Sequence, residues 1–209
     1  VGKEFQTAGY EVISLDYNKK FNATHTDDIL TWDYTIYTPD YFDVIWASPD
    51  CTTWSLATGG KYRLKKDIYG LNNAYQEKAT IGNNMILRLI EILKYFNADA
   101  WYIENPKALL HHFPPLIDFI KEYGNNTIVY YGNYNNWGFM KPTHIWSNLP
   151  LWENETKPIM PESSYVMKYH NYNKRPKRHY KAFLRNAEER SKIPPDLVTR
   201  LRQLIPNEV

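Results

Sequence analysis

Two short apolar runs, separated by a long amphipathic stretch, constrain the fold of this chain more than any other feature. Residues 43–49 and residues 98–104 both have the β-rich, nearly uninterrupted apolar character of buried strands. Between them, from residue 80 to residue 96, apolar side chains recur every three or four residues, which predicts an amphipathic helix. The chain therefore has at its centre a strand, a helix and a second strand.

The rest of the sequence continues this alternation of strands and helices. A helix is expected over residues 3–8, before Gly9, and the tail over residues 186–204 is helical in pattern but interrupted by Pro194-Pro195. The other expected elements are strands at 10–16, 127–131 and 143–147 and a helix at 116–123, before Gly124. Such an alternation predicts an α/β fold with a mostly parallel sheet that is covered by helices on both faces.

Composition predicts a soluble, cytoplasmic protein. The 209 residues, 43% of them hydrophobic, suffice for one compact core. No apolar run reaches the roughly 18 to 20 residues of a membrane helix, and the N-terminus lacks a signal-peptide pattern. The lone cysteine, Cys51, excludes an internal disulfide and fits a reducing compartment. One cysteine and six scattered histidines supply no ligand cluster, so no metal is expected.

Charge is divided unevenly along the chain. Residues 1–150 carry 13 basic and 16 acidic side chains, whereas residues 151–209 carry 12 and 7. Between residues 168 and 192 the basic side chains alternate with tyrosines and histidines, a mixture that suits a phosphate backbone and exposed bases. Taken alone, this stretch fits a solvated charged face equally well.

Reactive side chains follow three of the expected strands. Asp16 ends the first, Ser48-Pro-Asp-Cys51 follows the second, and Glu104 ends the third. Because the carboxyl ends of parallel strands meet at one edge of a sheet, these groups are expected to lie along that edge. A thiol beside a carboxyl group suggests covalent catalysis with an acid partner. On these residues alone, Cys51 fits a packing role and Glu104 a helix cap equally well.

The motifs around these residues resemble those of a known enzyme family. Ser48-Pro-Asp-Cys-Thr-Thr-Trp-Ser55, followed by Ile103-Glu-Asn-Pro106, is similar to the two catalytic motifs of cytosine-C5 DNA methyltransferases, especially small phage- and virus-type members. Further similar segments are residues 9–17, 28–29, 138–148 and 190–197. The resemblance spans nearly the whole chain. It implies a Rossmann-like methyltransferase fold. It also implies that the protein is a monomer and acts on double-stranded DNA.

For the catalytic residues, the resemblance implies one role each. Cys51 would add to C6 of a flipped-out cytosine, which enables C5 to attack a methyl group. Glu104 would hydrogen-bond N3 of the base and stabilise the charge that develops there. Asn105 would fix the loop that carries Glu104, and Lys141 would contact the base or its phosphate.

The resemblance also implies the cofactor and the DNA contacts. S-adenosylmethionine would lie across the strand ends, with Asp16 on its ribose, Tyr17 on its adenine ring, and Asp28 and Ile29 at the adenine edge; Pro49 would border it. The basic residues expected to contact DNA are Lys61, Arg63, Lys65 and Lys66 in the loop after the nucleophile, and Arg175, Lys177, Arg178 and Lys181 near the C-terminal end.

By the same resemblance, the chain divides into three parts. Residues 1–148 would form the cofactor-binding catalytic domain, residues 149–182 a small irregular target-recognition insert, and residues 183–209 a helical segment that packs back on the catalytic domain.

The sequence departs from the family pattern in two places. The family's first strand and Gly-rich loop have no counterpart, so we expect them upstream of residue 1. Asp50 stands where the family has proline, and its carboxylate is expected to raise the pKa of Cys51.

Other functions fit parts of the same sequence. A degenerate relative that binds DNA without methylating it would be consistent with Asp50 and the short recognition insert. Transfer to an exocyclic amine of adenine or cytosine fits Ser48-Pro49 in part, but Cys51 stands where those enzymes place an aromatic ring. An RNA substrate also stays open, because single-stranded bases need no flipping.

Overall fold

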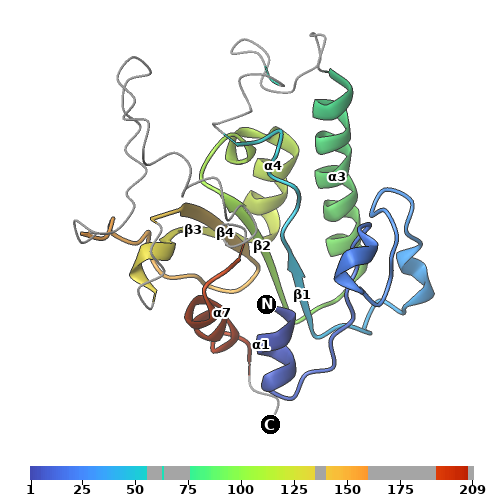
Figure 1. Cartoon of the computed structure of the whole chain (residues 1–209), viewed down its shortest axis with the longest axis horizontal. Coiled ribbons are helices and arrows are strands. Elements are labelled where there is room, and N and C mark those ends of the chain that lie inside the picture. Colours follow the sequence, from blue (N-terminus) through green and yellow to red (C-terminus); the bar gives the residue numbers. More distant parts are fainter. Residues whose placement is uncertain (56–62, 64–75, 135–139, 160–191, 207–209) are drawn as a thin grey trace.

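A four-stranded sheet forms the centre of the molecule (Figure 1). The computed structural model describes residues 1–55, 63, 76–134, 140–159 and 192–206. The strands are β1 (Val44–Ala47), β2 (Ala100–Pro106), β3 (Asn125–Tyr130) and β4 (Pro142–Ser147), and their order across the sheet is β1-β2-β4-β3. All four coincide with expected strands, and the mixed α/β class is confirmed.

The direction of the strands differs from the expectation of a mostly parallel sheet. β1 and β2 are parallel, with Val44 opposite Ala100. β4 is antiparallel to both of its neighbours, β2 and β3, and places Ile145 opposite Glu104. β3 and β4 follow each other in sequence with a connection too short for the crossover that a parallel pair needs, so an antiparallel arrangement is required there.

Helices cover both faces of the sheet, as predicted. The amphipathic stretch forms α3 (Gln76–Tyr95), which lies with α4 (Pro114–Tyr123) on one face; α1 (Gly2–Thr7) and α7 (Pro195–Arg202) lie on the other. The alternation of side chains along β2 produces two cores, because Trp101 and Ile103 face α3 and α4 whereas Tyr102 faces α7. Single 3-10 turns occur at Lys19–Phe21 (η1), Tyr34–Ile36 (η2), Leu110–His112 (η3) and Tyr131–Asn133 (η4).

Two elements differ from the sequence-based expectations. Residues 10–16 do not form a regular strand; Leu15 makes one isolated parallel bridge to His25, and no strand among the described residues pairs with the other edge of this segment. β2 continues through Pro106, which is its last residue and lies opposite Thr143. A proline is tolerated there because it ends the strand.

Glycine follows two of the helices, and a different physical reason favours it at each position. Gly9, after α1, has φ +93°, a left-handed conformation that glycine adopts without strain. Gly124, after α4, is extended, but a Cβ at this position would lie 2.8 Å from the carbonyl oxygen of Ser147. The second glycine therefore allows the chain between α4 and β3 to approach Ser147 and the Trp101 ring closely, and it makes no left-handed turn. Among the described helices none is long and apolar enough to cross a membrane.

Candidate functional site

Cys51 lies in a tight turn directly after β1. Its carbonyl oxygen accepts hydrogen bonds from the backbone N–H groups of Trp54 (3.0 Å) and Ser55 (2.8 Å). Asp50 stabilises the same turn, because its Oδ1 accepts from the backbone N (2.9 Å) and the Oγ1 (2.6 Å) of Thr52. The thiol is half-buried. The backbone that carries the predicted nucleophile is thus fixed by local hydrogen bonds.

Glu104 is buried near the end of β2, with 5% of its surface exposed. Its Oε1 accepts a hydrogen bond from the hydroxyl of Tyr131 (2.8 Å) in η4, and the ammonium of Lys141 lies 3.4 Å from the same oxygen. Lys141 Nζ also lies 4.5 Å from the centroid of the Tyr131 ring. A buried carboxylate requires such partners, because an uncompensated charge would be costly away from water.

The strand ends of β1 and β2 bring the two predicted catalytic motifs together. Asn105 Nδ2 donates to the carbonyl oxygen of Pro49 at 3.0 Å, which joins the Glu104 segment to the Cys51 turn. The charges of Glu104 and Lys141 both act on the Cys51 thiol. The four residues expected to be catalytic therefore share one site in the structure.

The environment of Cys51 favours the neutral thiol over the thiolate. Burial is the largest cause that raises the pKa of Cys51, and the carboxylate of Asp50 is the next. Lys141 lowers this pKa and Glu104 raises it. The direction that the sequence predicted for Asp50 is thus confirmed. Among the described neighbours that act on the thiol, Lys141 is the cation that offsets the effect of Asp50 on the pKa of Cys51.

Arg63 corrects one expectation. We expected it on a DNA-facing loop, but it is 2% exposed. Its guanidinium donates to the carbonyl oxygen (3.0 Å) and Oγ1 (3.2 Å) of Thr53, to Asn83 Oδ1 (2.8 Å) and to the carbonyl oxygen of Ala79 (3.3 Å). It also lies 3.3 Å from the ring centroid of Trp54. Arg63 therefore anchors the Cys51 turn (residues 51–55) to α3, and a buried guanidinium in this network is not placed to bind phosphate.

A large cleft brings together the residues expected to bind cofactor. Its volume is about 1030 Å³, and it runs between residues 10–18, β1 and α3. All five of the expected cofactor residues line it: Asp16, Tyr17, Asp28, Ile29 and Pro49. Asp16 Oδ1 and Asp28 Oδ1 accept backbone N–H groups of Asn18 (2.7 Å) and Leu30 (3.0 Å), which fixes both carboxylates in turns, and Tyr17 is 76% exposed.

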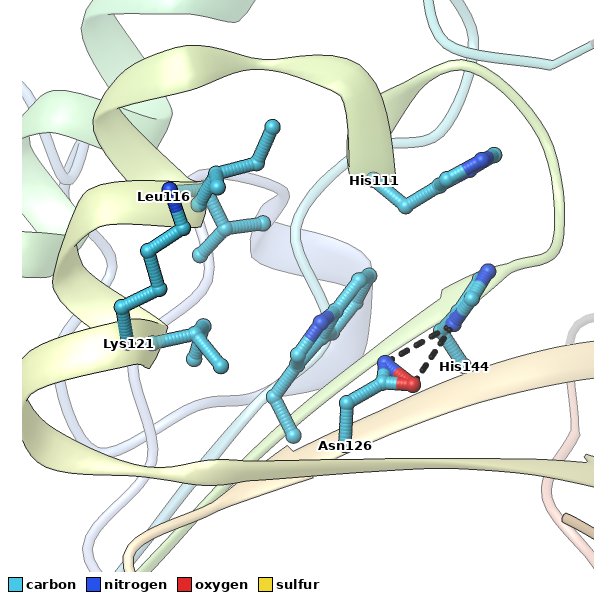
Figure 2. A pocket seen from close by; sticks show the side chains of 8 residues that line it. His111, Leu116, Lys121, Asn126 and His144 are labelled. Carbon is cyan, nitrogen blue, oxygen red and sulfur yellow. Dashed lines mark hydrogen bonds between the residues drawn. The ribbon is translucent and has the colours of Figure 1, made fainter.

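A second, smaller pocket of about 270 Å³ lies between α4 and the sheet (Figure 2). The rings of His111, His144 and Trp146 form a continuous stack beside it, with centroids 4.8 Å and 5.0 Å apart. The amide of Asn126 lies 3.0 to 3.2 Å from His144 Nδ1. Burial is the largest cause that lowers the pKa of His144, to about 4. No sequence pattern predicts a role for these residues.

Several expected residues cannot be placed. Lys61, Lys65, Lys66, Arg175, Lys177, Arg178 and Lys181 lie outside the described residues, so their DNA contacts stay predictions. Within the described ranges no group of three or more His, Cys, Asp or Glu side chains could hold a metal ion.

Tyr131 and Trp54 also belong to the site, and neither was predicted from the sequence. Both are buried aromatics within strand-like or motif segments, and nothing in the pattern separates such residues from ordinary core.

Comparison with known proteins supports the motif-based resemblance. No protein-family model matches the chain. The chain is 28% identical over 153 residues to a probable DNA (cytosine-5)-methyltransferase of Frog virus 3 (isolate Goorha). The match covers 69% of this chain and spans 63% of the length of that viral protein. The resemblance to the viral branch of the cytosine-C5 DNA methyltransferases, which the motifs indicate, is thereby confirmed.

Proposed function

We propose that this protein transfers a methyl group from S-adenosylmethionine to C5 of cytosine in DNA. The observation that carries this proposal is the meeting of Cys51, Glu104 and Lys141 at the ends of β1 and β2. A thiol, a carboxylate and an ammonium in one partly buried site are the groups that addition to a pyrimidine ring requires. The named viral relative supports the same class of reaction.

Each site residue has a defined task in this reaction. The Cys51 thiol loses its proton and its sulfur bonds to C6 of a cytosine that has left the duplex, which places an electron pair on C5. Glu104 hydrogen-bonds the N3 edge of the base, where negative charge develops. The methyl transfer leaves S-adenosylhomocysteine as the product of the donor. The proton on C5 then passes to water, the C5–C6 double bond re-forms as the bond from sulfur to C6 breaks, and the thiolate is released. Lys141 favours the thiolate of Cys51 electrostatically.

The large cleft fits the chemistry of S-adenosylmethionine. Carboxylates of Asp16 and Asp28 can accept hydrogen bonds from ribose hydroxyls and an adenine amine, and exposed Tyr17 offers a ring for stacking. Pro49, next to the Cys51 turn, lines the same cleft. When bound, the cofactor supplies an electrophilic methyl group on a sulfonium. The protein's part is to hold it beside the site of Cys51.

We also propose that the four described strands are part of a larger, Rossmann-like sheet. Among the described strands, β1 pairs only with β2, and residues 14–16 pair only with residues 24–25. The cleft lies between these two edges, and its volume of about 1030 Å³ leaves room for backbone as well as a cofactor. The additional strand and Gly-rich loop expected from the family pattern would occupy this place.

We also propose a DNA-binding surface and a division of the chain into three parts, as the family resemblance implies. Residues 149–182 would read the target sequence, and the basic side chains expected near their end would contact phosphates. Neutralising Arg175, Lys177, Arg178 and Lys181 should then weaken DNA binding and flatten its dependence on salt.

Trapping on a duplex that contains 5-fluorocytosine tests the proposed reaction. Fluorine at C5 cannot leave as a proton does, so the covalent adduct should accumulate when S-adenosylmethionine is present. Cys51→Ser should abolish the adduct and reduce methyl transfer about a thousandfold or more. A duplex with ordinary cytosine is the matched control and should not accumulate adduct. A wild-type protein that forms no adduct and transfers no methyl group would contradict the proposal.

A second candidate function is a protein that binds DNA without methylating it. Burial and the Asp50 carboxylate both raise the pKa of Cys51, which disfavours the thiolate. Calorimetry with S-adenosylmethionine, followed by a methyl-transfer assay on DNA, separates the two candidates. Binding of DNA or cofactor without transfer would favour this second function.

A further inference from the structure

Tyr131 contacts both charged groups that flank the nucleophile, although it belongs to neither catalytic motif. Its hydroxyl donates to Glu104 Oε1 at 2.8 Å, and its ring lies 4.5 Å from Lys141 Nζ. Lys141 in turn lies 3.4 Å from the same Oε1. One side chain therefore fixes a carboxylate with its hydroxyl and an ammonium with its ring.

The Tyr131 hydroxyl also has Thr143 as a hydrogen-bond partner, but its own proton is donated to Glu104. The side chain is fully buried, and Glu104 is 5% exposed, so their hydrogen bond competes little with water. Burial and the nearby Glu104 carboxylate raise the pKa of Tyr131 well above its ordinary value. The hydroxyl thus stays protonated, and Tyr131 is a permanent donor to the carboxylate.

The arrangement also determines which oxygen of Glu104 faces a substrate. Among the described residues, Tyr131 and Lys141 donate to this carboxylate, and both reach Oε1. With Oε1 engaged, Oε2 is the oxygen left to hydrogen-bond a base. We propose that Tyr131 is a positioning residue, which holds Glu104 and Lys141 in the orientation that methyl transfer requires. This inference rests on the proposed function of the site.

Tyr134 provides a matched control on the same turn. It follows Tyr131 by three residues, it is also buried, and its backbone N–H donates to the Tyr131 carbonyl oxygen. Its hydroxyl, however, donates to Glu155 and not to Glu104. Tyr131 begins η4 and Tyr134 caps its C-terminal end, so removing either hydroxyl deletes the same atom from neighbouring positions, but only the Tyr131 hydroxyl contacts Glu104.

Kinetics of four variants test the proposal. Tyr131→Phe should lower kcat about ten- to hundredfold with little change in KM for DNA, because a hydrogen bond to a charged group is lost while the ring stays. Tyr134→Phe should leave kcat within about twofold. If Tyr131 acts through Glu104, the double variant Tyr131→Phe/Glu104→Gln should be no slower than Glu104→Gln alone. Equal losses in the two tyrosine variants, or additive losses in the double variant, would overturn the proposal.

A spectroscopic measurement keeps the test independent of methyl transfer. The carboxyl ¹³C resonance of Glu104, identified by its loss in Glu104→Gln, should move in Tyr131→Phe and stay in place in Tyr134→Phe. If the wild type proves inactive while this resonance moves as expected, the proposed function fails and the positioning role stands. If the wild type is active and the resonance does not move, the positioning role is wrong.

Discussion

At the scale of single residues, Asp50 has two opposing effects on its neighbour Cys51. Its Oδ1 accepts from the backbone and hydroxyl of Thr52 and so holds the turn, whereas its charge raises the pKa of Cys51. Replacement by the proline of the family would remove both effects at once. Asp50→Asn separates them, because an amide oxygen can still accept the two hydrogen bonds but carries no charge.

We expect Asp50→Asn to lower the pKa of Cys51. The rate of alkylation by iodoacetamide, measured against pH, reports this directly, since Cys51 is the only thiol in the chain. Alkylation of the variant should reach half of its maximal rate at a lower pH than that of the wild type. Asp33→Asn is the matched control: Asp33 caps Thr35 in the same way but is not among the charges that act on Cys51. An unchanged alkylation profile in Asp50→Asn would show that the Asp50 charge is screened.

At the scale of elements, α3 approaches the Cys51 turn so closely that one helical position must be glycine. A Cβ on Gly82 would lie 2.5 Å from Thr53 Oγ1 and 3.3 Å from a guanidinium nitrogen of Arg63. Thr53 and Arg63 are both buried and hydrogen-bonded to each other, so neither moves freely. The contact therefore outweighs the preference of a helix for alanine.

Gly82→Ala should lower the free energy of unfolding by about 1 to 2 kcal/mol, because overpacking exceeds the gain of about 1 kcal/mol in helix propensity. Urea denaturation measures this change. Asn84→Ala on the same helix is the control; its side chain is exposed, and it should be neutral or slightly stabilising. If Gly82→Ala is as stable as Asn84→Ala, the close approach of α3 to the turn is not maintained in solution.

The sequence predicted the elements better than their pairing. The 3.6-residue period of α3 and the apolar runs of β1 and β2 are local signals, and the structure confirms all three. The antiparallel placement of β4 depends on which strand it meets, which no local pattern carries. Residues 10–16 have strand composition but only one bridge, because a strand needs partners as well as propensity. The expectation that Arg63 contacts DNA was wrong for a similar reason. A basic residue in a glycine-containing loop is expected to be exposed, and only the packing of the folded chain shows that Arg63 is buried.

At the scale of the whole molecule, the sheet separates the proposed chemistry from a buried histidine cluster. Glu104 lies on the side of β2 that holds Tyr102, whereas His144 and Trp146 alternate with Ile145 on β4 and pack with His111 toward α4. His144 is 5% exposed, and its Nε2 has no partner among the described side chains and backbone. A charge on this ring would be poorly compensated, because the charged or titratable groups that act on it, His111, Lys107 and His112, all disfavour protonation.

This cluster should make the folded protein sensitive to acid. The folded-state pKa of His144 is lowered to about 4, whereas the unfolded chain has the ordinary value of about 6.5, so the unfolded state binds the proton first. The stability that depends on a neutral His144 is complete above pH 6.5 and is lost as the pH falls toward 4, by up to about 3 kcal/mol. Urea denaturation between pH 7 and pH 4.5 should show this loss. In His144→Gln the free energy of unfolding should fall less steeply with decreasing pH, by the slope that corresponds to the uptake of about one proton on unfolding. This difference in slope does not depend on the variant's stability at pH 7. Because the slopes of the two proteins are compared, the titration of the carboxylates, which both proteins share, cancels. Identical slopes in the wild type and in His144→Gln would show that His144 is solvated or protonated in the folded state.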